Sequence, residues 1–261
     1  MDLQVSKNKK THVTGVKDQY ETFPYPLRDP EDDRRRLVTT LGGNLDGISH
    51  FAFGGRRDFS KPMRVLVAGG GTGDALIYLA QQLADRGCPA ELVYIDLSTA
   101  SREISERRAA IRGLKVTFVT GSLLEVGTLA PGPYDYIDCS GVLHHLPDPD
   151  AGLAALAAQL AADGAMGIML YGTLGRSGVY PMQAMLRTLA PATTLPAAER
   201  LAIFRGVMAS LPPTNLLRNN RCWASPRRRT ITSCSTCSCT PRTAATPSRK
   251  SAPSPPEPDC G

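Results

Sequence analysis

Five short apolar segments alternate with helical segments in the middle of the chain, and this alternation limits the fold more than any other feature. The apolar segments are MRVLVAGGG, ELVYIDLS, LKVTFVTGS, YDYIDCSGVL and AMGIMLYGT, which begin at residues 63, 91, 114, 134 and 165. Amphipathic or Ala-rich segments predict helices at 74–87, 99–113 and 151–164. Apolar strands separated by helices are typical of a parallel sheet covered on both faces. We therefore expect an α/β fold with a doubly wound, mostly parallel sheet.

The first expected strand runs into a glycine-rich loop, V-A-G-G-G-T-G-D, with Gly69, Gly71 and Gly73 at alternate positions. A turn this tight needs residues that tolerate positive φ and lack a Cβ, which also lets a ligand approach the backbone. The dinucleotide fingerprint G-x-G-x-x-G would require Gly or Ala at position 74, where this chain has Asp74. The loop is a candidate nucleotide-binding turn, although a purely structural turn could contain the same glycines.

One acidic residue, Asp96, ends the second expected strand, 23 residues after Gly73. A carboxylate at the end of a strand can accept hydrogen bonds from both hydroxyls of a ribose. The competing interpretation is that Asp96 caps the helix that Ser98 and Thr99 open.

The spacing G-x-G-x-G followed by Asp96 resembles that of class I, Rossmann-like S-adenosylmethionine-dependent methyltransferases. The segment YDYIDCSGVLHHLPDP, from residue 134, resembles the fourth strand and following loop of the small-molecule branch of that family, and QYETFPYP and YGTLGRSGVY also resemble it. The resemblance covers residues 18–220. It implies S-adenosyl-L-methionine as the cofactor and a small molecule as the methyl acceptor.

By position, the resemblance implies cofactor contacts at eight residues. The methionine part of the cofactor would lie against Gly69, Gly71 and Gly73, the ribose on Asp96, the adenine on Ser122 and Leu123, and the methyl-donor side along Ser140 and Gly141. Two positions depart from the family. Val67 stands where an acidic residue often precedes the first glycine by two positions, so one polar contact is missing. Ser122 stands where an Asp commonly contacts the adenine amino group, so backbone would hold the adenine.

Two neighbouring histidines, His144 and His145, follow the fourth expected strand and have the intrinsic pKa of a general base. A hydroxyl or protonated nitrogen acceptor would need such a base, whereas a thiol or activated carbon would not. The alternative is that both are loop histidines bonded to nearby backbone. They have no third ligand at metal spacing, so we expect no metal site.

Aromatic and basic residues near both ends of the core are candidates for substrate contact. Tyr171, Arg176 and Tyr180 follow the fifth strand, at the end of an open α/β sheet where ligands bind. Tyr20 and Tyr25 belong to an aromatic and Pro-rich segment that could cover a pocket as a lid or simply pack against the sheet edge.

The last 41 residues differ in composition from the rest. The net charge is +6, but residues 221–261 hold seven Lys and Arg against two acids, which leaves 23 basic and 22 acidic residues before them. This neutral body, with no Asn-Pro-Pro-Tyr motif, argues against nucleic acid as substrate. The tail contains five Cys and seven Pro but no Leu, Val, Phe, Met or Tyr. It cannot form buried strands.

A one-base slip in the coding sequence near residue 220 would explain this tail. In the shifted frame every Cys codon yields a codon ending in TG, so all five tail cysteines become Leu, Met or Val. The alternative is a genuine disordered segment. On the first hypothesis the chain as given lacks the last two strands of the methyltransferase fold.

These observations predict five parts: a disordered arm (1–17), an N-terminal cap segment (18–62), a Rossmann-like core (63–180), a helical substrate-side segment (181–220) and a disordered, out-of-frame tail (221–261). No apolar run of about 20 residues and no secretory signal is found in the sequence, so we expect a cytoplasmic protein that does not span a membrane. The sequence does not predict an oligomeric state.

Three functional hypotheses remain open at this point. The leading one is a methyltransferase that acts on an unidentified small molecule. The second is a truncated or degenerate cofactor-binding fold without catalytic activity. The third, a nucleotide-dependent oxidoreductase, is disfavoured by the loop spacing.

Restoring one base near codon 220 tests the hypothesis of a shifted frame. We expect the restored protein to be more soluble and to bind S-adenosylhomocysteine more tightly than the present chain, because it regains apolar strand residues. Solubility after purification and isothermal titration calorimetry measure the two properties. A restored protein that is no better folded would show that the tail is a genuine appendage.

Overall fold

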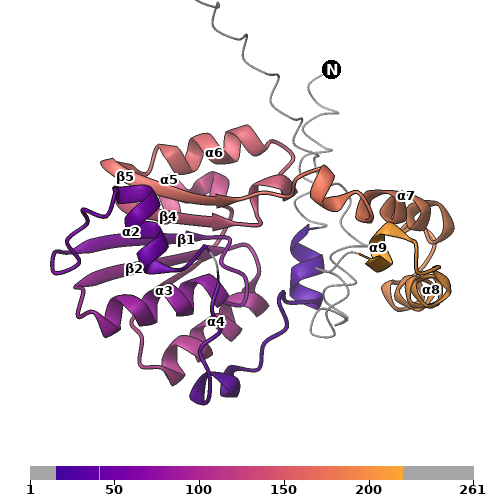
Figure 1. The fold of residues 1–261 in the computed structure, drawn as a ribbon, viewed down its shortest axis with the longest axis horizontal. Helices are drawn as coiled ribbons and strands as arrows, with labels where there is room; N and C mark the ends of the chain where they lie inside the picture. Colours follow the sequence, from indigo (N-terminus) through magenta and orange to yellow (C-terminus); the bar gives the residue numbers. More distant parts are fainter. Residues whose placement is uncertain (1–15, 41, 220–261) are drawn as a thin grey trace, which may run out of the picture.

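The computed structural model describes residues 16–40 and 42–219, which form a five-stranded sheet with helices on both faces (Figure 1). The strands are β1 (Met63–Ala68), β2 (Ala90–Asp96), β3 (Thr117–Thr120), β4 (Tyr134–Ser140) and β5 (Leu160–Met169). All strand pairs are parallel, in the order β3-β2-β1-β4-β5. The predicted doubly wound α/β fold is confirmed. The prediction for residues 221–261 lies outside the described residues, as does that of a disordered arm (1–17) except at Val16 and Lys17, which are helical.

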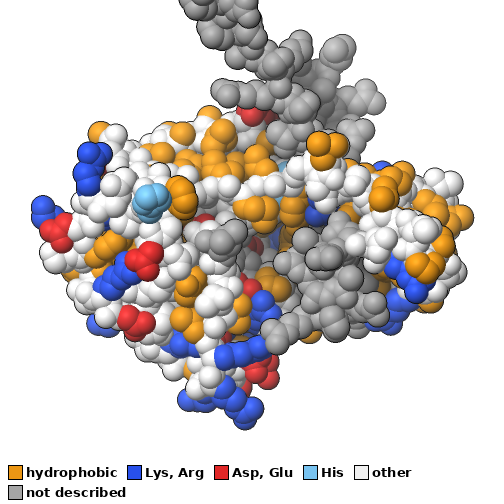
Figure 2. Space-filling model, viewed as in Figure 1, with side chains coloured by type: hydrophobic (Ala, Val, Ile, Leu, Met, Phe, Trp, Pro, Cys, Tyr) orange, Lys and Arg blue, Asp and Glu red, His pale blue; other side chains and the backbone are white. Residues whose placement is uncertain are grey.

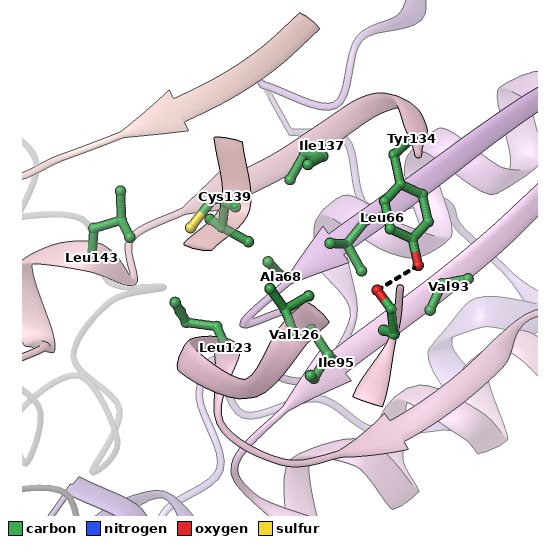
Figure 3. Close-up of a cluster of buried hydrophobic side chains, with 12 residues drawn as sticks. Leu66, Ala68, Val93, Ile95, Leu123, Val126, Tyr134, Ile137, Cys139 and Leu143 are labelled. Atoms are coloured by element: carbon green, nitrogen blue, oxygen red, sulfur yellow. Dashed lines mark hydrogen bonds between the residues drawn. The ribbon is translucent and has the colours of Figure 1, made fainter. Parts of the chain in front are cut away.

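Side chains alternate along the buried strands, so each face of the sheet has its own core. On one face, residues such as Leu66, Ile95 and Ile137 pack under α5 (Val126–Leu129) and α6 (Pro149–Ala157) (Figure 3). On the other, Val65, Leu92 and Tyr136 pack against α2 (Leu45–Phe53) and α3 (Asp74–Asp85). The helix α4 (Thr99–Ile111) continues this second layer beside β2 and β3.

The predicted helices at 74–87 and 99–113 are confirmed as α3 and α4, and Gly87 and Gly113 follow them with φ of 64° and 65°. The prediction of a helix over 151–164 is wrong at its second half, because α6 ends at Ala157 and β5 begins at Leu160. The strand pairs Leu160 with Tyr134 and then Ala165 with Tyr136, so the intervening residues form a bulge. Hydrogen bonding to β4 thus outweighs the helix propensity of an Ala-rich segment.

The strand β5 lies at the edge of the sheet formed by the described residues. Ile168, Met169 and Leu170 are 41–44% exposed there. Hydrophobic side chains gather over this part of the molecule (Figure 2).

After β5 the chain leaves the sheet through a 3-10 turn, η4 (Leu174–Arg176), and enters three helices, α7 (Val179–Leu189), α8 (Ala197–Ser210) and α9 (Leu216–Asn219). These helices lie together beyond the carboxyl end of β5 (Figure 1) and share a small core of Val179, Met182 and Leu217. They correspond to the helical segment expected over 181–220, although α7 begins two residues earlier, at Val179. Within residues 16–40 and 42–219, no helix combines the length and apolar character needed to cross a membrane.

A buried guanidinium connects the N-terminal part of the chain to this sheet. Arg108 of α4 is 1% exposed and pairs with Asp33 of η1 (Pro30–Arg34) at 2.5 Å and with Asp74 of α3 at 2.8 Å. It also donates to the carbonyl oxygen of Thr72 at 2.8 Å. One side chain therefore joins η1, the glycine-rich loop, α3 and α4.

Replacing Arg108 by Ala should lower the free energy of unfolding by about 3–5 kcal/mol, because it removes one of the two guanidinium partners of the buried Asp33 carboxylate, Arg112 being the other, and one partner of Asp74. Urea denaturation followed by circular dichroism measures the change. The matched control is Arg107→Ala on the exposed side of the same helix, where the change should stay within about 0.5 kcal/mol. Equal effects of the two substitutions would contradict this account of the ion pair.

Candidate functional site

The glycine-rich loop between β1 and α3 has a left-handed backbone conformation at three positions, which favours glycine there. Gly69, Gly71 and Gly73 have φ of 69°, 52° and 95°. A Cβ on Gly71 would lie 2.7 Å from the carbonyl oxygen of Tyr25, so a larger residue does not fit there. From the sheet, the hydroxyl of Tyr94 donates to the carbonyl oxygen of Gly71 at 2.6 Å. The loop is clamped between β2 and the N-terminal segment.

Asp96, at the carboxyl end of β2, connects this loop to the next turn. Its Oδ2 accepts from the N–H of Gly71 and its Oδ1 from the N–H of Ser98, both at 2.8 Å. Burial raises the pKa of Asp96, whereas these N–H groups act in the opposite direction. A carboxylate has about four acceptor positions, so these two hydrogen bonds do not use all of them. The N-cap of α4 is Ser98, whose Oγ accepts from the N–H of Ser101, so Asp96 is not the capping residue.

Residues 16–29 form a segment, here called the N-terminal cover, that lies over both turns; its residues 16–22 are helical. The carboxylate of Glu21 accepts from the N–H groups of Thr99 and Ala100 at 2.7 and 3.0 Å, at the start of α4. Burial works to raise the pKa of Glu21, but the N–H groups of Ala100 and Thr99 outweigh it and lower the pKa overall. Glu21 thus satisfies backbone donors that a helix leaves unpaired at its first turn.

The second half of the N-terminal cover binds the glycine-rich loop. The hydroxyl of Thr72 donates to the carbonyl oxygen of Pro26 at 2.6 Å. Arg28 forms two hydrogen bonds with Asp74, at 2.8 and 2.5 Å. Asp74, which breaks the dinucleotide fingerprint, therefore anchors Arg28 and Arg108 at the start of α3.

Six residues that the sequence singles out lie together beyond the carboxyl ends of β4 and β5, and we call them the histidine cluster: Tyr20, His144, His145, Tyr171, Arg176 and Tyr180. The ring centroids of His144 and Tyr171 are 3.9 Å apart, and those of His144 and His145 are 4.3 Å apart. Arg176 lies over Tyr171 at 3.9 Å from its centroid, within the range of a cation–π interaction. The cluster joins the N-terminal cover to the loops after β4 and β5.

Burial makes His144 a weak base. The residue is 1% exposed, and neither ring nitrogen has a hydrogen-bond partner within the part of the chain that the structure describes. Burial, with a smaller contribution from Arg176, lowers the pKa of His144 to about 4. The ring is neutral near pH 7, and the ordinary pKa on which the sequence-based argument relied does not hold at this position. Tyr20, which lies 3.5 Å from the Nε2 of His145, has its pKa raised by burial.

The other predicted contact residues lie after β3 and at the end of β4. Ser122 accepts from the N–H of Leu124 at 3.2 Å, whereas the side chain of Leu123 belongs to the hydrophobic core. Ser140 donates to Asp138 at 3.0 Å, and the N–H of Gly141 donates to the carbonyl oxygen of Met169 at 3.0 Å. Tyr25 meets the glycine-rich loop through its backbone and is not one of the histidine cluster.

Three residues of this site were missed from the sequence: Glu21, Tyr94 and Asp138. Glu21 acts on a helix 78 residues away, and no local pattern marks such a contact. Tyr94 reads as an ordinary strand residue. Asp138 had a detectable signal, because an acidic residue in the middle of a buried, apolar strand requires an explanation.

Comparison with known proteins identifies the central part of this fold. Residues 66–166 match the family model described as a methyltransferase domain. A solved structure of PKMT2 from Rickettsia typhi, in complex with AdoHcy, is similar with a TM-score of 0.50 and 18% identity, covering 72% of this chain and 36% of that one. At this identity the likeness concerns the fold alone.

Curated relatives extend the match at the level of sequence. An uncharacterized protein of Synechococcus sp. is 34% identical over 201 residues, which is 76% of this chain and 46% of that protein. A ubiquinone biosynthesis O-methyltransferase of Bordetella avium is 33% identical over 160 residues, or 61% of each chain. The chain thus spans between about half and three fifths of the length of these two relatives.

The ring of His144 should titrate with a midpoint at about pH 4, far below the ordinary histidine value of about 6.5. The Cε1–Hε1 resonance in a proton–carbon NMR titration measures the midpoint, and His144→Gln assigns the signal. Because Arg176 disfavours the imidazolium, Arg176→Met should raise the midpoint, while burial still keeps it below the ordinary value. A midpoint near 6.5 in the unsubstituted protein would contradict the burial of this ring.

Proposed function

We propose that this chain, whose residues 66–166 form a methyltransferase domain of the class I, Rossmann-like fold, binds S-adenosyl-L-methionine and methylates a small molecule. The observation that carries the proposal is the contact between Asp96 and the N–H of Gly71, which puts the glycine-rich loop and the β2 carboxylate side by side. The family match favours this function over an oxidoreductase or a fold without activity.

The residues present fit such a cofactor. Gly71 has no Cβ, and the loop backbone lies close to Asp96, whose carboxylate accepts from the N–H of Gly71 at 2.8 Å. Asp96 has acceptor positions left for the two ribose hydroxyls. We assign the methionine part to Gly69, Gly71 and Gly73, the adenine to the backbone near Ser122 and Leu123, and the methyl-donor side to Ser140 and Gly141.

When bound, S-adenosylmethionine supplies an electrophilic methyl group on a sulfonium that is a good leaving group, so alignment is the main task left to the protein. The histidine cluster is our candidate for aligning the acceptor, because it lies beyond the carboxyl ends of β4 and β5, where α/β sheets bind ligands. In this cluster the aromatic rings of Tyr171 and Tyr180 suit a planar small molecule, and the guanidinium of Arg176 suits an anionic one. Tyr20 would close this site from the N-terminal cover.

The histidines have a defined part if the acceptor is a hydroxyl, as the name of the Bordetella relative suggests. His144 is neutral at pH 7 and has both ring nitrogens without a partner among the described residues, so one of them can accept a hydrogen bond from the acceptor. Its lowered pKa makes it an orienting acceptor and a poor final base. His145, beside it, is then the candidate to take the proton.

Replacement of Asp96 by Ala should weaken S-adenosylhomocysteine binding at least about tenfold, because two charge-assisted hydrogen bonds of about 1.5–3 kcal/mol each are lost in gross terms. Isothermal titration calorimetry measures the affinity. The matched control is Asp85→Ala, which removes an exposed carboxylate at the end of α3 and should leave the affinity unchanged. A thermal melt of each variant checks that the loop is not simply unfolded.

Titration of the unsubstituted protein with S-adenosylhomocysteine and with NAD separates the classes of function. Binding of NAD alone would end the methyltransferase proposal. Binding of neither would favour a fold without activity, and an unchanged affinity in Asp96→Ala would refute the ribose assignment.

A further inference from the structure

The strand β1 brings no charge to the base of the glycine-rich loop. Val67 stands where the methyltransferase family often has an acidic residue. Its side chain is 1% exposed and packs with Leu76 and Tyr94. The ammonium group of a methionine moiety would therefore find no anion on this strand.

The neighbouring strand supplies a carboxylate at the same level. In the parallel ladder between β1 and β4, Val67 pairs directly with Asp138. Paired residues of adjacent strands point to the same face of a sheet, about 4.8 Å apart. Tyr136, two residues earlier on β4, packs in the same core as Val65 and so agrees with this assignment of faces. Asp138 is thus the nearest substitute that the fold offers for an acid at position 67.

The surroundings of Asp138 lack a positive charge. The residue is 2% exposed, and Ser140 donates to its Oδ1 at 3.0 Å. Within residues 16–40 and 42–219, no Lys, Arg or His forms an ion pair with it. Burial accordingly raises the pKa of Asp138 to about 6. A buried carboxylate without a cation is unfavourable, and a bound cation would remove the penalty.

The position facing this carboxyl carries no side chain. A Cβ on Gly42 would lie 3.8 Å from the Oδ1 of Asp138 and 3.5 Å from the Oγ of Ser140, both ordinary contact distances. Because residue 42 is a glycine, no side chain of that residue covers the Oδ1 of Asp138 or the Oγ of Ser140.

We infer that Asp138 binds the ammonium group of the methionine part of the cofactor, from β4, in place of the acid that β1 lacks. The inference rests on the proposed function, since it concerns the same ligand. Asp138 supplies the negative charge that suits the ammonium group of that moiety. Ser140, which donates to Asp138, orients the carboxyl group.

A comparison of two ligands on two proteins isolates this contact. The ligands are S-adenosylhomocysteine and its desamino analogue, in which hydrogen replaces the amino group. The proteins are the unsubstituted chain and Asp138→Asn, which keeps the shape and removes the charge. We expect the unsubstituted protein to bind the desamino analogue roughly tenfold or more weakly than S-adenosylhomocysteine. We expect Asp138→Asn to lose this preference and to bind S-adenosylhomocysteine as weakly as the analogue. Asp163→Asn, an exposed residue of β5, is the control and should behave like the unsubstituted chain.

A relocated acid gives a second test. The double variant Val67→Asp with Asp138→Val moves the carboxylate from β4 to β1, and we expect it to recover part of the preference for the amino group.

The outcomes distinguish a failure of the proposed function from a failure of the assignment of Asp138. If the unsubstituted protein binds neither ligand, the proposed function fails. If it binds both equally well, the inference about Asp138 is overturned whether or not the variants fold. Loss of affinity for both ligands by the same factor in Asp138→Asn would also overturn it, because Asp138 would then act only through the structure of the loop.

Discussion

The guanidinium of Arg108 is the interaction on which the rest of the site depends. It lies inside the protein with Asp33, Asp74 and the carbonyl oxygen of Thr72 as its partners. A buried cation is tolerated only where such partners surround it. These partners can surround Arg108 only when three parts of the chain are in place at once. They are η1 with Asp33, the start of α3 with Asp74, and the glycine-rich loop with Thr72. The conformation of that loop is thus held by α4, a helix that follows the loop only after α3 and β2.

The N-terminal cover supplies hydrogen-bond acceptors for donor groups in the turns after β1 and β2. A βα turn exposes the backbone N–H groups at the start of a helix, and here the carboxylate of Glu21 accepts two of them from α4. The carbonyl oxygen of Pro26 does the same for the hydroxyl of Thr72. The cover is therefore part of the framework of the site, and its aromatic residue Tyr20 reaches the histidine cluster from there.

The sequence predicts the features that depend on local patterns. Apolar strands, helix ends and the spacing of Gly69, Gly71 and Gly73 are local, and they correctly predicted the layers and the position of the loop. The start of β5 was predicted wrongly because its Ala-rich sequence favours a helix locally, and only pairing with β4 makes it a strand. The pairing of Val67 with Asp138 depends on the register of two strands about seventy residues apart, which no pattern along one chain encodes. Likewise, the low pKa of His144 arises from burial under residues that are distant in sequence.

The order in which the chain is synthesised gives the N-terminal cover a particular place in folding. Residues 16–29 leave the ribosome before their partners, because Asp74 lies 46 residues after Arg28 and Ala100 lies 79 residues after Glu21. Closing loops of that length costs entropy that only the finished β1–α3 and β2–α4 units can repay. This early segment is consequently among the last to dock, and until α4 exists Glu21 has no backbone N–H groups to bind.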